Sequence, residues 1–162
     1  MLSVISTADR PDLVPITGRW RWEAFFRDEM GLEEMLRLEE AYASNGELMP
    51  TVLVLIHGDD PVGMIALCLD DLEGRPDLNP WLAGVYVDQA HRGNGYALRL
   101  IEELEALAQR EGLTQLSLYT GNAVGLYQKA GWSQIETFER KGREYAIMQK
   151  NFPTIRVTAS GQ

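Results

Sequence analysis

Several residue types and patterns are scarce in this 162-residue sequence, and each scarcity narrows what the protein can be. Cysteine occurs once, at Cys68, so no disulfide can form within the chain, and no cluster with metal-ligand spacing surrounds it. No apolar run approaches the roughly 18 residues of a membrane-spanning helix, and residues 1–12 lack the charged-then-apolar order of a secretion signal. These absences predict a cytoplasmic protein that holds no metal and binds no membrane.

Positive charge is also scarce. The chain has 15 Lys and Arg against 24 Asp and Glu, a formal net charge of −9, which favours solubility and argues against nucleic acid as a partner. Apolar residues make up 45% and charged residues 24%, as in ordinary soluble domains long enough to bury their own core. We expect one domain over residues 1–152 and a polar C-terminal tail over 153–162.

The hydrophobic pattern predicts an α/β fold with a mixed sheet. Mostly antiparallel strands form hairpins at both ends of the sheet, one βαβ unit lies between them, and helices flank the sheet. Helices are expected over residues 11–27, 33–43, 97–111 and 122–130, and strands over 51–57, 62–69, 81–87, 113–120, 132–138 and 144–150.

A glycine-bearing loop, Arg92-Gly93-Asn94-Gly95-Tyr96-Ala97, joins the third strand to the long helix. Glycine lets the backbone approach a ligand closely, and the first N–H groups of a helix form an anion site. The loop therefore predicts a bound phosphate or pyrophosphate of a nucleotide-type cofactor. No Lys follows Gly95, which excludes a P-loop, and Leu98 stands where a dinucleotide fingerprint needs its third glycine.

Two motifs resemble those of a known family. Arg92-x-x-Gly95-x-Ala97 is similar to the signature of the GNAT superfamily of acyl-CoA-dependent N-acyltransferases, and residues 85–91 look like the strand and loop that enter it. Asn122, followed by Leu126-Tyr127-Gln128-Lys129-Ala130-Gly131-Trp132, resembles a later block of the same family. The resemblance spans residues 62–151, and the predicted order of elements is also the family's order.

The resemblance implies transfer of an acetyl group from acetyl-CoA to a primary amine by direct attack. Val85 and Val87 would bind the pantetheine arm through their main chain, and Asn122 would cap the short helix and shape the cofactor site. Tyr127 would protonate the departing thiolate. The backbone amides that would hold the pyrophosphate belong to Arg92, Gly93, Asn94, Gly95, Tyr96 and Ala97.

The sequence leaves the general base open. Many members of the family carry an acidic residue on the strand that corresponds to residues 81–87, and none is present here. Asp70, Asp71, Glu23, His57 and ordered water all remain candidates. A solvated turn is the simpler interpretation of Asp70 and Asp71, so no base is assigned.

The acceptor is open as well, and a small molecule and a peptide amine fit equally. The aromatic run Trp20, Trp22, Phe25 and Phe26 either lines an acceptor pocket or packs the first helix. The missing strand carboxylate motivates an alternative function, a catalytically weak acyl-CoA sensor or partner-binding module. A homodimer through a sheet edge or the C-terminal hairpin is compatible with the pattern.

The cofactor prediction can be tested by thermal unfolding with acetyl-CoA, CoA, NAD and ATP. At 100 times its dissociation constant, a true ligand adds about 2.7 kcal/mol of stability. We expect stabilisation by acetyl-CoA and CoA alone, and its loss in Gly95→Asp, which places a negative charge in the anion site. Stabilisation by NAD or ATP instead would contradict the acyl-CoA assignment.

Overall fold

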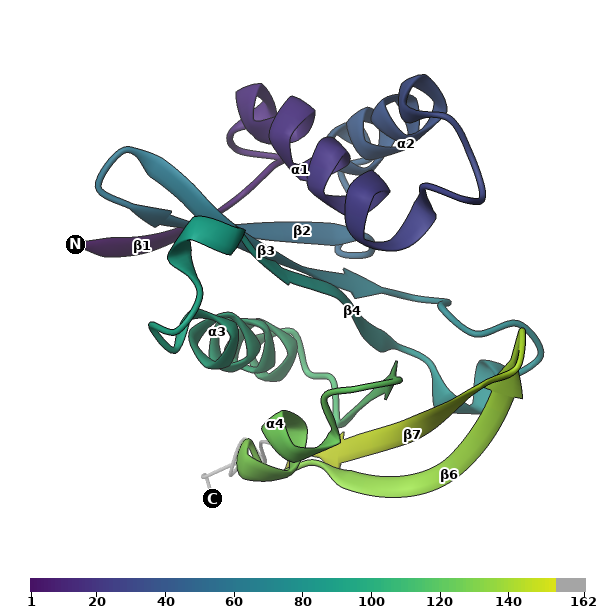
Figure 1. The fold of residues 1–162 in the computed structure, drawn as a ribbon. Helices are drawn as coiled ribbons and strands as arrows, with labels where there is room; N and C mark the ends of the chain where they lie inside the picture. The colour runs from purple at the N-terminus through teal and green to yellow at the C-terminus, as the bar shows by residue number, and fades with distance from the viewer. Residues whose placement is uncertain (154–162) are drawn as a thin grey trace, which may run out of the picture.

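A seven-stranded mixed sheet runs through the molecule, in the order β1-β2-β3-β4-β5-β7-β6 (Figure 1). The computed structural model describes residues 1–153. All neighbouring strands are antiparallel except β4 and β5, which are parallel and connected through α3, so the predicted fold class is confirmed. The strands are β1 (Leu2–Ser6), β2 (Thr51–His57), β3 (Asp60–Cys68), β4 (Trp81–Val87), β5 (Gln115–Thr120), β6 (Ser133–Arg140) and β7 (Arg143–Asn151).

Two helices cover each face of the sheet (Figure 1). On one face, α1 and α2 lie over the half that contains β2 and β3, and on the other face lie α3 and α4. The helices are α1 (Val14–Arg21), α2 (Leu32–Ser44), α3 (Tyr96–Arg110) and α4 (Val124–Lys129). Short 3-10 helices precede α1, β4 and α3, at Pro11–Leu13, Pro76–Leu78 and Gln89–His91.

The structure adds features that the hydrophobic pattern did not predict. Strand β1 pairs with β2 at the edge of the sheet, with Leu2 opposite His57. The expected helix over residues 11–27 is divided into a 3-10 turn, α1 and a π-helical turn, Trp22–Phe26. The indole of Trp22 donates a hydrogen bond to the carbonyl of Met30 at 2.8 Å, which fixes the path of the chain beyond this turn. Most of the expected polar tail, residues 154–162, lies outside the described residues.

Alternating strand residues divide the core between the two faces of the sheet. On the α3 face, aliphatic side chains of β2, β3 and β5 pack against Leu100, Ile101 and Leu104 of α3. The opposite face buries Trp20 of α1 against β2 and β3. This division explains why the 3.6-residue apolar period of α3 was a reliable signal, since the helix buries one continuous stripe.

Strands β4 and β5 diverge soon after they meet. Within residues 1–153, one bridge joins them, Trp81 with Ser117, supported by a hydrogen bond from Ser117 N–H to the carbonyl of Pro80 at 3.0 Å. Beyond it, β4 remains paired with β3 but shifts its register near Gly84, whose φ is +61°. The β5-facing edge of β4 is therefore left without a strand partner.

A buried ion pair docks α1 and α2 onto the irregular part of β4. Arg21 donates from Nε to Oε1 of Glu39 at 2.7 Å and from Nη2 to Oε2 at 3.3 Å, and both side chains are almost fully buried. The guanidinium also occupies the space where a Cβ at Gly84 would lie. Gly84 is therefore required twice, by its positive φ and by its contact with Arg21.

The ion pair should make single substitutions far more costly than paired ones. Glu39→Leu leaves the Arg21 charge buried without a partner and should reduce the free energy of unfolding by about 3–5 kcal/mol. The double variant Arg21→Met with Glu39→Leu removes both charges and should lose clearly less than the single variant. Urea unfolding measures both, and a double variant as unstable as Glu39→Leu would contradict this account.

Candidate active site

The predicted glycine loop lies between β4 and α3 in the conformation that an anion site needs. Gly93 and Gly95 both have positive φ, +85° and +76°, and Gly95 is the residue that immediately precedes α3. The Asn94 side chain donates to the carbonyl of His91 at 2.9 Å, and Arg92 Nε donates to the carbonyl of Val87 at 3.0 Å. These bonds hold the side chains of Arg92 and Asn94 back against the preceding turn.

Most N–H groups of the loop remain free for a ligand, whereas that of Arg92 donates to the carbonyl of Gln89 at 3.5 Å. The first hydrogen bond into α3 runs from Arg99 N–H to the carbonyl of Gly95, so the N–H groups of Tyr96 and Ala97 precede it. Within residues 1–153, the N–H groups of Gly93, Asn94 and Gly95 also have no acceptor. No charged side chain is required for such a site, because the free N–H groups and the helix dipole supply the positive potential.

The side chains of Val85 and Val87 pack toward the core on the α3 face. Their main chain belongs to the edge of β4 that β5 leaves unpaired. The carbonyl of Val87 is partly engaged, since it accepts from Arg92, so Val85 is the freer of the two positions.

Asn122 is not the N-cap of the short helix, as the sequence suggested. The residue before α4 is Ala123, and the side-chain oxygen of Thr120 accepts hydrogen bonds from the N–H groups of Ala123 at 3.0 Å and Asn122 at 3.4 Å. Thr120 at the end of β5 therefore takes the capping role, and the exposed Asn122 side chain is left at the mouth of the β4–β5 gap.

Tyr127 lies on α4 with its ring buried against Trp132, at 6.1 Å between ring centroids. Burial raises the pKa of Tyr127 to about 12, so its hydroxyl stays protonated at neutral pH. That hydroxyl is not fully enclosed and has no hydrogen-bond partner among the described residues. Tyr127 is therefore available as a donor to a ligand.

Glu105 of α3 fixes the position of α4. Its carboxylate accepts from the indole of Trp132 at 3.0 Å and from Nζ of Lys150 at 2.6 Å, and Lys150 also donates to the carbonyl of Ala130. Trp132 is 2% exposed and packs in the core beside Tyr127.

A floor of aromatic side chains covers the β5–β7 half of the sheet on the face opposite α3. We call Trp81, Tyr119, Phe138 and Tyr145 the aromatic floor. Tyr119 contacts the other three rings, with centroids 5.5 to 6.1 Å apart. The helices α1 and α2 cover the other half of this face (Figure 1), and Leu72 and Leu78 of the β3–β4 loop pack in one cluster with Trp81, Tyr119 and Phe138.

The sequence left open whether the aromatic residues of the first helix line an acceptor pocket or pack the helix. Trp20 is core, at 5% exposure and 5.4 Å from the ring of Tyr86, whereas Phe25 is 48% exposed. Trp22 and Phe26 are half-buried in the π-helical turn. Trp20 therefore packs, and the other three lie at the surface end of the helix.

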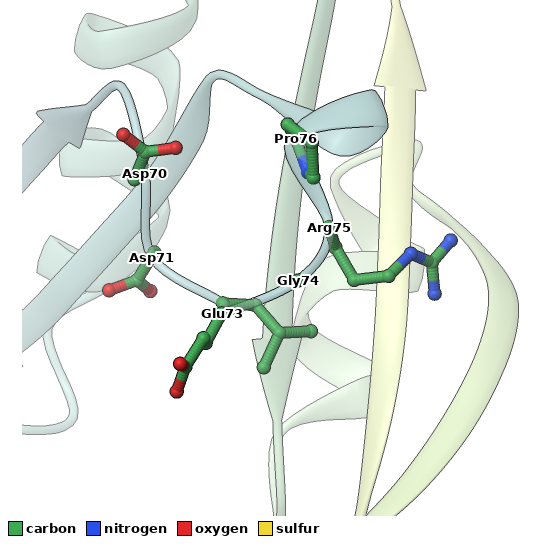
Figure 2. Close-up of a pocket in the computed structure, with 7 residues that line it drawn as sticks. Asp70, Asp71, Glu73, Gly74, Arg75 and Pro76 are labelled. Carbon is green, nitrogen blue, oxygen red and sulfur yellow. The ribbon is translucent and has the colours of Figure 1, made fainter.

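The loop between β3 and β4 borders a hollow of about 540 Å³ lined by residues 70–76 (Figure 2). Its acidic residues differ in environment, because Asp70 and Glu73 are exposed while Asp71 is half-buried. Burial raises the pKa of Asp71 to about 7, and the positive charges of Arg21 and Arg140 limit the increase. Figure 2 shows Arg75 pointing away from both aspartates, in the direction of Glu136 and Asp77, its ion-pair partners.

The other candidates for a base are less suited to proton uptake. His57 lies exposed at the end of β2, and Glu23 is exposed on the π-helical turn. Asp70 is exposed and accepts from the side chain of Asn79 at 2.6 Å. Among residues 1–153, no three His, Cys, Asp or Glu side chains are grouped so as to hold a metal ion.

Sequence comparison identifies the family. The model of the acetyltransferase (GNAT) family matches residues 16–132, which is most of the chain. The chain belongs to the GNAT acetyltransferase family. It is therefore an enzyme of the N-acetyltransferase type, and the family predicted from the glycine loop and the Tyr127 block is confirmed.

Solved structures of other GNAT acetyltransferases share the fold. An aminoglycoside 6'-N-acetyltransferase complexed with coenzyme A is 15% identical, with a TM-score of 0.75 over 96% of this chain and 99% of the other. A GNAT acetyltransferase from Streptococcus pneumoniae is 21% identical, with a TM-score of 0.71 over 94% and 100% of the two chains. A ribosomal-protein-alanine N-acetyltransferase from Brucella melitensis is 22% identical, with a TM-score of 0.69 over 94% and 99%. No curated protein matches the chain.

In the described part of this GNAT acetyltransferase, no helix is both long and apolar enough to cross a lipid bilayer.

The sequence analysis missed or set aside two residues of the site. Thr120 caps α4, for which a Thr just before the Asn122 motif was a usable signal. Asp71 was taken for part of a solvated turn, whereas it is half-buried, and the charges that act on it belong to Arg21 and Arg140, which are far away in the sequence.

The pH dependence of stability tests the environment of Asp71. In the unfolded chain its carboxyl titrates at about 3.9, whereas in the fold its pKa is raised to about 7. Stability present below pH 4 is therefore lost as the pH rises to 7, because ionisation disfavours the folded state. We expect Asp71→Asn to raise the Tm by about 2–6 °C at pH 8 and to change it little at pH 4.

The matched control is Asp70→Asn, which changes the exposed neighbour and keeps an acceptor for Asn79. Its Tm difference from the wild type should not vary with pH in this way. Equal behaviour of the two variants in differential scanning calorimetry would show that Asp71 is not selectively desolvated.

Proposed function

We propose that this GNAT acetyltransferase transfers an acetyl group from acetyl-CoA to a primary amine by direct attack. One observation carries the proposal: the free N–H groups before α3 lie next to an edge of β4 that has no strand partner beyond Trp81. The N–H groups suit a pyrophosphate, and the strand edge suits the amide-bearing pantetheine arm, which binds as an added strand. A related fold that is complexed with coenzyme A supports the same ligand.

In the proposed complex, the main chain of residues 92–97 holds the pyrophosphate, and Val85 supplies the principal contact to the pantetheine. Val87 contributes only where Arg92 leaves its carbonyl available. Asn122 contacts the arm from the opposite side of the gap, beside the first turn of α4. No metal is required by this arrangement of donors.

The reaction begins when an amine that has lost its extra proton attacks the thioester carbonyl carbon. A C–N bond forms, negative charge develops on the carbonyl oxygen, and a main-chain N–H of the β4 edge stabilises that charge. The tetrahedral intermediate then collapses, the C–S bond breaks, and the nitrogen releases its second proton. The products are the acetylated amine and coenzyme A.

Tyr127 is proposed to donate a hydrogen bond, and finally a proton, to the departing thiolate. With a pKa raised to about 12, its hydroxyl is a weaker acid than a thiol of pKa about 8.5. The tyrosine therefore helps mostly by hydrogen bonding while the sulfur charge develops. Its loss should slow the reaction without abolishing it.

Asp71 is proposed as the group that takes up the proton that the attacking nitrogen releases. The positive charges of Arg21, which contacts β4 at Gly84, and of Arg140 beside the aromatic floor both act on its carboxylate. Its pKa of about 7 makes it a base that is mostly ionised just above neutral pH. This supplies the carboxylate that β4 itself lacks and weakens the alternative of a sensor without turnover.

The role of Tyr127 can be tested with Tyr127→Phe. We expect kcat for the best acceptor of an amine panel to fall about 10–100-fold, less than the full range of general acid catalysis, because the thiolate is a tolerable leaving group. Thiol release measures kcat, and calorimetry should give an unchanged Kd for acetyl-CoA. Tyr42→Phe, on α2, is the control, and an unaltered kcat in Tyr127→Phe would remove Tyr127 from the mechanism.

Gly58→Asp provides a control for Gly95→Asp in cofactor binding. Gly58 has nearly the same φ, +64°, and lies in the turn between β2 and β3. Both variants carry backbone strain and one added charge, but only Gly95→Asp alters the proposed pyrophosphate site.

A further inference from the structure

Two segments with charged residues of opposite sign flank the aromatic floor, and we call them its rims. On one side is the β3–β4 loop with Asp71, and on the other is the β6–β7 hairpin with Arg140 and Arg143. The two segments lie side by side at the end of the sheet, where Arg75 of the loop pairs with Glu136 of the hairpin (Figure 1). A ligand above the floor would contact both rims.

The two arginines are held over the floor by its rings. The Arg140 guanidinium carbon lies 5.4 Å from the centroid of Tyr119 and 5.5 Å from that of Phe138. Arg143 lies 5.3 Å from the centroid of Tyr145, and its guanidinium packs so closely on Gly121 that a Cβ there would clash. Stacking of this kind fixes the guanidinium planes and leaves their N–H edges free to bind an anion.

Neither guanidinium is neutralised by a carboxylate. Within residues 1–153, no Asp or Glu oxygen lies within 4.0 Å of Arg140 or Arg143. Lys141 between them differs, since it is 76% exposed and directed toward Glu29.

The opposite rim carries the complementary charge. Asp71 is close enough to Arg140 to interact with it electrostatically, yet the two do not form an ion pair. A molecule that presents an ammonium group to Asp71 and an anion to the arginines would match the charge on both sides.

From this arrangement, and building on the proposed function, we infer that the acceptor is a small amine that also carries a carboxylate, bound as a zwitterion. Arg140 and Arg143 bind the carboxylate through paired N–H donors, which match its two oxygens. The amine then lies on the Asp71 side, toward the β4–β5 gap. A polycationic acceptor would meet two uncompensated guanidinium groups, so this site disfavours it.

Matched acceptors test the inference. Phenylalanine, methionine and lysine are compared with their carboxamides and with their decarboxylated amines, by thiol release at saturating acetyl-CoA. A charge-assisted hydrogen bond contributes enough for roughly a 10–100-fold preference in kcat/KM for at least one free acid over its amide. The amine of an amino-acid amide is less basic than that of the free acid, so a larger fraction of it is unprotonated and able to attack. This difference favours the amides and works against the expected preference for the acids.

The arginine variants assign the preference to the two side chains. In Arg140→Gln and Arg143→Gln, the ratio of acid to amide should fall toward one. Lys141→Gln removes the same charge from the same hairpin and should keep the wild-type ratio. Stabilisation by acetyl-CoA in every variant shows that the fold and the cofactor site persist.

The outcomes separate this inference from the proposed function. Amides or decarboxylated amines acetylated as well as the acids would overturn the inference and leave amine acetylation intact. Acetyl-CoA binding with no acetylation of any free acid would also overturn it. An absence of acetyl-CoA binding in the wild-type protein would overturn the proposed function itself.

Discussion

The divergence of β4 from β5 is the constraint on which the rest of the site depends. Parallel neighbours normally continue side by side, but here a single bridge at Trp81 joins them before β4 turns aside at Gly84. Unpaired strand edges lose backbone hydrogen bonds. The fold tolerates this loss because other contacts hold each half of the sheet in place. Arg21 and Glu39 hold β4 from one face, and Glu105 ties α3 to α4 and β7 on the other.

The gap also separates two chemical environments. On the α3 face lie main-chain N–H groups before Tyr96, which suit an anionic cofactor, and the buried hydroxyl-bearing ring of Tyr127. On the opposite face lie the aromatic floor and the charged rims with Asp71 and Arg140. The acetyl donor and the amine acceptor can therefore approach the gap from opposite faces of the sheet.

The sequence predicted the parts of the molecule whose signals are local. The apolar period of α3, the paired glycines before it and the turn at Gly131 each describe one short segment, and the fold confirms those elements. Strand β1 was missed because five residues beginning at Leu2 give too short a pattern to distinguish from a loop. Asn122 was misplaced because a side-chain cap can come from either Thr120 or Asn122, and only coordinates decide between them.

Other features arise only from tertiary packing. The Arg21–Glu39 pair joins residues on different helices, and the charges that act on Asp71 belong to Arg21 and Arg140, which are far apart in the sequence. A sheet whose halves share one bridge is less firmly held together there than a continuously paired sheet. A ligand lying along β4 would add the missing cross-links and bring the rims to a fixed separation. The first substrate to bind would then prepare the site for the second, and a preferred order of binding would follow from mechanics alone.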